Sequence, residues 1–141
     1  MKRFDQNLLD YINNLRIIDS HEHLPGDEKN YLAEKRDVIT EILSLYIQND
    51  FISSGMKQKT ADFLLDTSRP IRERYKELLP WWDRCTYTGY GRMLSISVRD
   101  VLGEALSQGN IDRINEKFES LYSKGVYKRI LKDASKIEFA I

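Results

Sequence analysis

Apolar residues recur at helical spacing through most of this chain, and this periodicity restricts it to a mainly helical fold. The clearest case begins at Ile71 and continues at positions i+4, i+7, i+8 and i+11 with Tyr75, Leu78, Leu79 and Trp82. Pro80 lies inside that stretch, so we expect the helix to kink or divide there. Similar spacing predicts further helices at about residues 4–15, 37–48, 59–66, 94–102, 111–123 and 126–135.

Two short runs depart from the helical pattern. Residues 16–20 contain two adjacent β-branched side chains, and residues 136–141 alternate loosely between apolar and polar, so both predict strands. The fold class that we expect is therefore predominantly α with one or two short β-strands. Because the second predicted strand is followed by no partner in the sequence, we expect the chain to be part of a longer protein.

The charge balance narrows the range of partners. Lysine plus arginine and aspartate plus glutamate each number 22, so the formal net charge is zero, and we expect neither a nucleic-acid nor a membrane partner. No apolar run has the length of a membrane span, and the N-terminus lacks the features of a cleavable leader. The single cysteine, Cys85, excludes an internal disulfide and fits a reducing compartment. We expect a soluble cytoplasmic protein.

Several residues near Pro80 have predicted structural roles. Cys85, Trp81, Trp82 and Tyr87 are expected to pack inside the helical part of the chain. The polar positions between Ile71 and Trp82 predict a solvated face of mixed charge made by Arg72, Glu73, Arg74, Lys76 and Glu77.

Both histidines of the chain lie in the stretch RIIDSHEHLP, two residues apart. On a strand, side chains at i and i+2 share a face, so Asp19, His21 and His23 are expected to line one side. Two imidazoles at this spacing can bind one divalent ion, with Asp19 accepting a hydrogen bond from a ring N–H behind them. A surface or packing role for the two histidines fits the same pattern.

The stretch IIDSHEHLP resembles the first-strand signature of the amidohydrolase superfamily, and is most similar to the amidohydrolase-related branch that includes uronate isomerases. The resemblance implies the N-terminal part of a metal-dependent (β/α)8 TIM barrel. Residues 1–25 would hold an N-terminal helix and the first barrel strand, residues 26–135 a long helical insert containing TGYGR and VRDVLG, and residues 136–141 the start of the second strand.

The same resemblance implies a function. His21 and His23 would be ligands of a catalytic divalent metal, zinc first, with manganese or iron as alternatives. A metal-activated water would hydrolyse a small-molecule substrate. An isomerase of the uronate type or a decarboxylase of the same superfamily is the first alternative. A non-catalytic helical interaction module is the second.

This chain departs from the family in its ligand set. Family members take further ligands from later strands, whereas no third histidine occurs here. Three acids near the histidines could be considered as a third ligand. Glu22 would face away from the histidines on a strand, and Asp27 and Glu28 belong to a predicted loop. We therefore assign no catalytic residue, and expect little or no activity from this chain alone. Two strands with open edges would also favour a homo-oligomer, unless helices cover them.

The stretch Thr88–Arg92 is a second candidate site. Backbone N–H groups at a helix N-terminus, together with an arginine, can receive a substrate carboxylate, which makes Tyr90 and Arg92 candidate substrate-binding residues. A glycine turn between two helices, with Arg92 in solvent, is the alternative that we favour.

Overall fold

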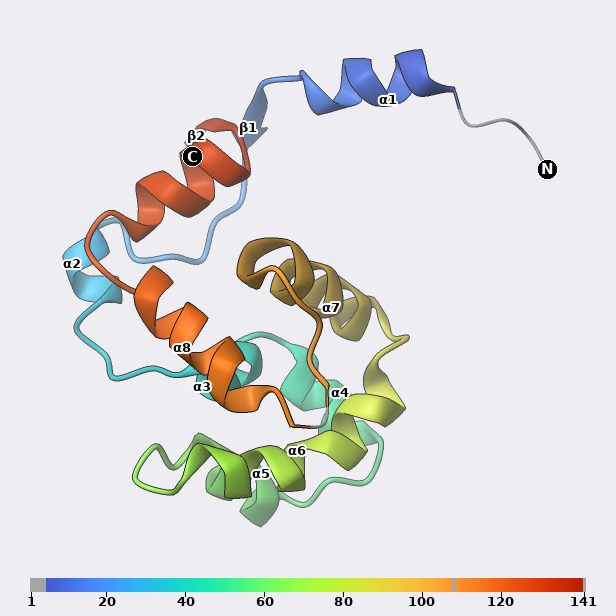
Figure 1. Cartoon of the computed structure of the whole chain (residues 1–141), viewed down its shortest axis with the longest axis vertical. Coiled ribbons are helices and arrows are strands. Elements are labelled where there is room, and N and C mark those ends of the chain that lie inside the picture. Colours follow the sequence, from blue (N-terminus) through green and yellow to red (C-terminus); the bar gives the residue numbers. More distant parts are fainter. Residues whose placement is uncertain (1–4, 108, 141) are drawn as a thin grey trace. The chain divides into compact units, whose positions relative to one another are not determined.

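Helices dominate the computed structural model, which describes residues 5–107 and 109–140 (Figure 1). In chain order, the elements are α1 (Gln6–Asn13), β1 (Ile17–Asp19), α2 (Glu28–Tyr31), α3 (Val38–Ser44), α4 (Ile47–Ser53), α5 (Gln58–Leu65), α6 (Ile71–Cys85), α7 (Gly89–Leu102), α8 (Ile111–Leu121), the π-helix η1 (Lys128–Ala134) and β2 (Ile137–Ala140). Within the described ranges, no helix has both the length and the apolar character that a bilayer crossing requires.

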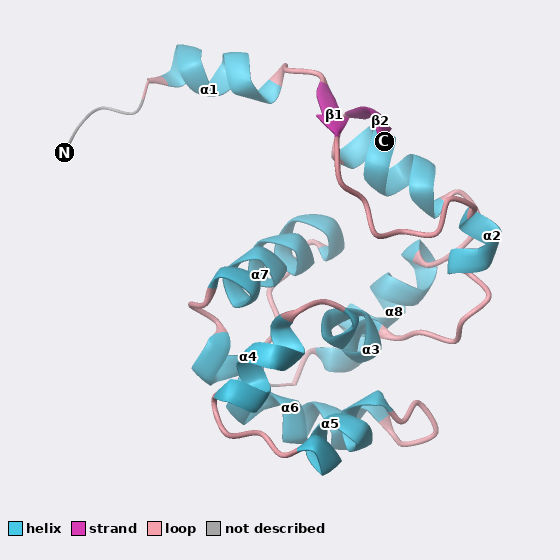
Figure 2. Cartoon of the chain, turned by 180° about the vertical axis from the view of Figure 1, so that it is seen from behind, coloured by secondary structure: helices cyan, strands magenta, loops and turns pink. Residues whose placement is uncertain are grey.

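The chain forms two compact units, which we describe separately. The helical unit, Leu32–Lys124, contains α3 to α8. The strand unit consists of the described residues up to Tyr31 and those from Gly125 onward, and contains α1, β1, α2, η1 and β2. Colouring by secondary structure shows the two strands beside each other in a chain that is otherwise helix and loop (Figure 2).

The two strands of the strand unit pair in parallel. Ile17 lies opposite Ile137 and Ile18 opposite Phe139, with an irregularity in the register between Ile17 and Ile18. The second predicted strand therefore has a partner, β1. Parallel strands inside α/β proteins are covered on both faces. Here Ile17 is 45% exposed, Ile18 55% and Phe139 51%.

This exposure differs from that of a barrel strand, although the mainly helical composition with two short strands is as expected. The expectation that the chain contains part of a TIM barrel is wrong: its described residues form eight α-helices, one π-helix and two short parallel strands, with no barrel. The physical reason lies in what the helices cover. The main apolar core lies between Val38 and Phe118, joins helix to helix, and includes no residue of either strand.

The helical unit buries its apolar side chains among α3, α4, α5, α6, α7 and α8. The predicted helix over residues 37–48 is divided, because Leu45 has an extended backbone with φ −94° and ψ 170°, and α4 begins two residues later. By contrast, α6 continues through Pro80 as one helix, so of the two expected outcomes, a kink or a division, the division is wrong. The large apolar side chains with no exposure are Ile39, Ile47, Phe51, Leu64, Leu78 and Ile114.

The aromatic and cysteine predictions around α6 have mixed outcomes. Trp82 and Cys85 are buried in the core, as predicted. Tyr87 is 89% exposed, so its predicted packing role is wrong. Tyr87 follows the end of α6 and precedes α7, where the helical spacing used for the prediction no longer applies.

A buried ion pair connects three helices of this unit. The Arg74 guanidinium, 1% exposed, donates through Nη2 to Asp37 Oδ2 and through Nη1 to the Leu64 carbonyl at 2.9 Å. Asp37 also caps α3, because its Oδ1 accepts from the backbone N–H groups of Ile39 at 3.1 Å and Thr40 at 3.0 Å. The pair thus joins the first turn of α6 to the start of α3 and the end of α5.

The position of Arg74 corrects the predicted charged face of α6. Arg72 is exposed and pairs with Asp112 at 2.7 Å, as expected for a solvated residue, whereas Arg74 is buried. The prediction that Arg74 is exposed to solvent rested only on the polarity of its side chain. Burial of a guanidinium is tolerated only where a carboxylate and further acceptors replace water, and Asp37 and Leu64 supply them here.

We expect Arg74→Ala to lower the free energy of unfolding by about 3–5 kcal/mol, because it leaves the Asp37 carboxylate buried without its counter-charge. The matched variant Arg72→Ala, on the same helix, removes an exposed pair and should cost less than about 1 kcal/mol. Urea denaturation followed by circular dichroism measures both values. Equal losses in the two variants would contradict the role given to Arg74.

Candidate metal-binding site

The two histidines lie on the loop that follows β1. The strand ends at Asp19, one residue earlier than predicted, so His21 and His23 are in irregular backbone rather than on a strand face. Both side chains are exposed. The alternation argument that placed them on one side therefore does not apply, and their relation depends on the conformation of the loop.

The loop nevertheless brings the two imidazole rings together. His21 Nε2 and His23 Nε2 are 2.8 Å apart, and the ring centroids are 4.6 Å apart at an interplanar angle of 81°. Such a contact requires one ring to donate its Nε2–H and the other to accept it, according to the tautomers. The same two nitrogen atoms can instead direct their lone pairs at one ion when both rings carry their proton on Nδ1.

Two carboxylates stabilise the backbone of this loop. Asp19 Oδ1 accepts from the His21 backbone N–H at 3.0 Å. Glu22 Oε1 accepts from the backbone N–H groups of His23 at 2.7 Å and Leu24 at 3.1 Å. Asp19 was predicted to accept from a ring N–H. In the structure, Oδ1 of this carboxylate accepts from the His21 backbone N–H, and so orients His21 through the main chain.

The acids considered as third ligands have other contacts. Asp27 Oδ1 accepts from the Lys29 backbone N–H at 2.9 Å. Glu28 accepts from the backbone N–H groups of Gly125 at 2.7 Å and Tyr127 at 2.9 Å, which fixes α2 to the segment before η1. In residues 5–107 and 109–140, no three histidine, cysteine or acidic side chains are grouped closely enough to hold a metal ion.

The geometry of the histidine pair fits two positions of a tetrahedral ion. Zinc–nitrogen bonds of about 2.0–2.1 Å place two ligands of one zinc about 3.3 Å apart. The observed 2.8 Å between His21 Nε2 and His23 Nε2 would have to widen by about half an ångström. Exposed side chains on a loop can make that adjustment by small rotations. The other two coordination positions would remain for water or an added ligand.

The Thr88–Arg92 stretch forms the start of α7 in the helical unit. Thr88 caps the helix, because its hydroxyl oxygen accepts from the Gly91 N–H at 3.1 Å, and the hydroxyl donates to Asp50 Oδ2. A carboxylate of the protein itself is thus already at this helix start, where a substrate carboxylate was considered. Arg92 is exposed, and the Tyr90 ring lies 5.3 Å from that of Tyr46.

Position 91 must be a glycine because the backbone at the end of α6 leaves no space for a side chain there. A Cβ atom built on Gly91 would lie 1.8 Å from the Cys85 carbonyl oxygen, so α7 begins in direct contact with the end of α6. At Gly89 a Cβ atom would meet nothing within 4 Å. The glycine pattern by itself predicts the same turn role for Gly89 and Gly91. It does not identify Asp50, which lies 38 positions from Thr88 and carries no local signal.

Comparison with family models, with curated proteins and with solved structures found no match. Any role for His21 and His23 is therefore argued from their motif and from the geometry of their loop.

We expect Gly91→Ala to destabilise the chain by about 1–3 kcal/mol, because the added methyl group must displace the backbone of α6 or α7. Gly89→Ala is the matched control. It adds the same methyl group in open space near a helix start, and should change stability by less than about 1 kcal/mol, in the stabilising direction. Thermal and urea unfolding measure both. Similar values for the two variants would contradict the close contact between α6 and α7.

Proposed function

We propose that this chain binds one divalent transition-metal ion through His21 and His23, and that the ion serves hydrolytic chemistry of the amidohydrolase type. The observation that carries the proposal is the convergence of the two Nε2 atoms to 2.8 Å on an exposed loop. Solvent exposure gives an ion direct access. The hydrogen bonds that Asp19 and Glu22 accept from the loop backbone reduce the entropy that binding would cost.

Zinc is the first candidate ion. Neutral imidazole is a common ligand of zinc, copper, iron and nickel, whereas calcium and magnesium prefer oxygen ligands. Imidazole binds metals only in its neutral form, so protons compete for the same nitrogen atoms, and occupancy should fall in acid. Manganese and iron are the alternatives.

A bound divalent ion would supply Lewis-acid chemistry, lowering the pKa of a water molecule or polarising a carbonyl group. In this chain, His21 and His23 would hold the ion, while Asp19 and Glu22 maintain the loop. Catalytic zinc sites usually have three protein ligands and a proton acceptor in reach. The described residues supply two ligands, so we propose metal binding without substantial turnover for this chain alone.

We expect purified protein to bind zinc at one ion per chain, and His21→Ala or His23→Ala to weaken binding by more than about tenfold. Even residues that only orient a metal ligand commonly contribute 10- to 100-fold to affinity. Isothermal titration calorimetry with zinc chloride, with metal content measured after dialysis, gives both affinity and stoichiometry.

Asp27→Asn is the control, because it changes a loop acid that was considered as a third ligand while keeping an oxygen that can accept from Lys29. Its zinc affinity should equal that of the unmodified chain. Undiminished zinc binding in the double variant His21→Ala/His23→Ala would refute the site. Absence of stoichiometric metal in the unmodified chain would also refute it, and would favour a helical interaction module.

A further inference from the structure

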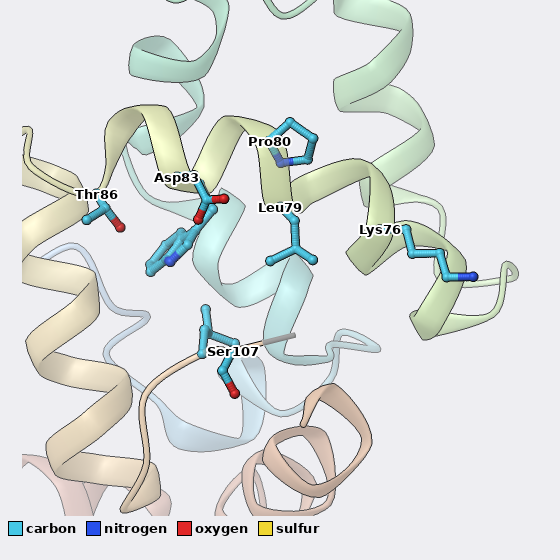
Figure 3. Close-up of a pocket in the computed structure, with 8 residues that line it drawn as sticks. Lys76, Leu79, Pro80, Asp83, Thr86 and Ser107 are labelled. Carbon is cyan, nitrogen blue, oxygen red and sulfur yellow. The ribbon is translucent and has the colours of Figure 1, made fainter. Parts of the chain in front are cut away.

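The helical unit contains a cavity of about 650 Å³ beside α6. That volume is within the usual range for small-molecule sites. In Figure 3, Asp83 and Thr86 lie toward one end of the exposed side of α6 and Lys76 toward the other, with Leu79 between them and Ser107 opposite. The residues that line the cavity include Lys76, Leu79, Trp82, Asp83, Leu106 and Ser107.

Polar groups around this cavity have no hydrogen-bond or ion-pair partner among the described residues. Trp82 is only 6% exposed, yet its indole N–H makes no hydrogen bond within the described ranges. The Asp83 carboxylate and the Lys76 ammonium group, both exposed, also form no ion pair there. Among the described residues, the fully buried side-chain nitrogen and oxygen atoms without a partner are Arg36 Nε and Arg74 Nε, so the Trp82 N–H still reaches solvent and is available to a ligand. The cavity thus presents a donor, an anion and a cation that the fold itself does not use.

The wall opposite α6 is fixed before any ligand arrives. The Tyr75 hydroxyl donates to the Ser107 carbonyl at 3.0 Å, and the Ser107 N–H donates to Asn110 Oδ1 at 2.9 Å. Burial, with a smaller effect of the Asp83 charge, raises the pKa of Tyr75 to about 12, so the phenol keeps its proton and remains a donor. Because this wall is already ordered, binding a ligand costs less conformational entropy.

Pro80 leaves one carbonyl of α6 without its usual helical hydrogen bond. Proline has no backbone N–H, so the Lys76 carbonyl does not receive the hydrogen bond that residue 80 would normally donate in a helix. Both Lys76 and Pro80 line the cavity.

We propose that this cavity binds a small zwitterion with an apolar middle, of the length of a tripeptide. Its ammonium group would bind Asp83, its carboxylate Lys76, and its apolar part Leu79 and Leu106. Lys76 and Asp83 are seven positions apart on α6, which is about 10 Å of helix rise. Three extended peptide residues also span about 10 Å. The Trp82 N–H would donate to a carbonyl in the middle of the ligand.

The proposal follows from the opposite charges at the two ends. A simple cation would leave Lys76 unpaired and repelled, and a simple anion would do the same at Asp83. A zwitterion satisfies both. This site lies in the helical unit and does not depend on the proposed metal site.

The test uses the full chain with Trp81→Phe, which leaves Trp82 as the sole tryptophan reporter. Titration with glycyl-leucyl-glycine should give a saturable change in Trp82 fluorescence. The N-acetylated peptide and the C-terminal amide should each bind at least about threefold more weakly, as should the free peptide with Asp83→Asn or Lys76→Gln. Glu77→Gln, an exposed acid of α6 outside the cavity lining, should leave binding unchanged.

A result without saturation at about 20 mM peptide would overturn the proposal, since that concentration exceeds what a site with two ion pairs requires. Equal binding of the free and both blocked peptides would overturn it too, as would unchanged binding with Asp83→Asn. If Trp81→Phe fails to fold by circular dichroism, the amide resonances of Thr86 and Ser107 in the unmodified chain provide the same titration.

Discussion

The helical unit depends on the buried ion pair between Arg74 and Asp37. A guanidinium removed from water costs several kcal/mol unless charge and hydrogen bonds replace its hydration. Asp37 replaces the charge, and the Leu64 carbonyl accepts a further hydrogen bond. Because Asp37 also caps α3 and the neighbouring Val38 N–H donates to Asn115 of α8 at 3.1 Å, four helices meet at one polar point. None of the four can shift without breaking a hydrogen bond that is buried or partly buried.

This internal attachment determines what α6 presents on its other side. Arg74 holds the helix from within, and the adjacent Tyr75 holds the wall at Ser107. The exposed side of α6 therefore has a fixed distance to that wall, and Lys76 and Asp83 keep a fixed spacing along one rigid helix. The separation of the two charges beside the cavity is therefore a consequence of the contacts that Arg74 and Tyr75 make inside the helical unit.

The histidine pair shows how far local sequence can identify a site. Two histidines two positions apart, after an apolar run, were sufficient to select His21 and His23 as candidate ligands. The strand geometry offered as the reason was wrong, because β1 ends at Asp19. The rings meet through a loop that Asp19 and Glu22 hold by backbone hydrogen bonds over one or two residues. The absence of a third ligand near them in the described residues is a property of the folded chain, and spacing alone could not decide it.

The sequence by itself determined most of the helices, because periodicity, caps and stops act within about four residues. The glycine stop at Gly103, with φ 77°, and the broad apolar faces of α6 and α8 are of this kind. Only the tertiary structure decided that Arg74 is buried, that α7 begins against the Cys85 carbonyl, and that the strands form an exposed pair rather than part of a barrel. The physical reason is the distance along the sequence between the residues that interact. These features join residues 6 to 122 positions apart, and their energies depend on partners that local pattern does not name.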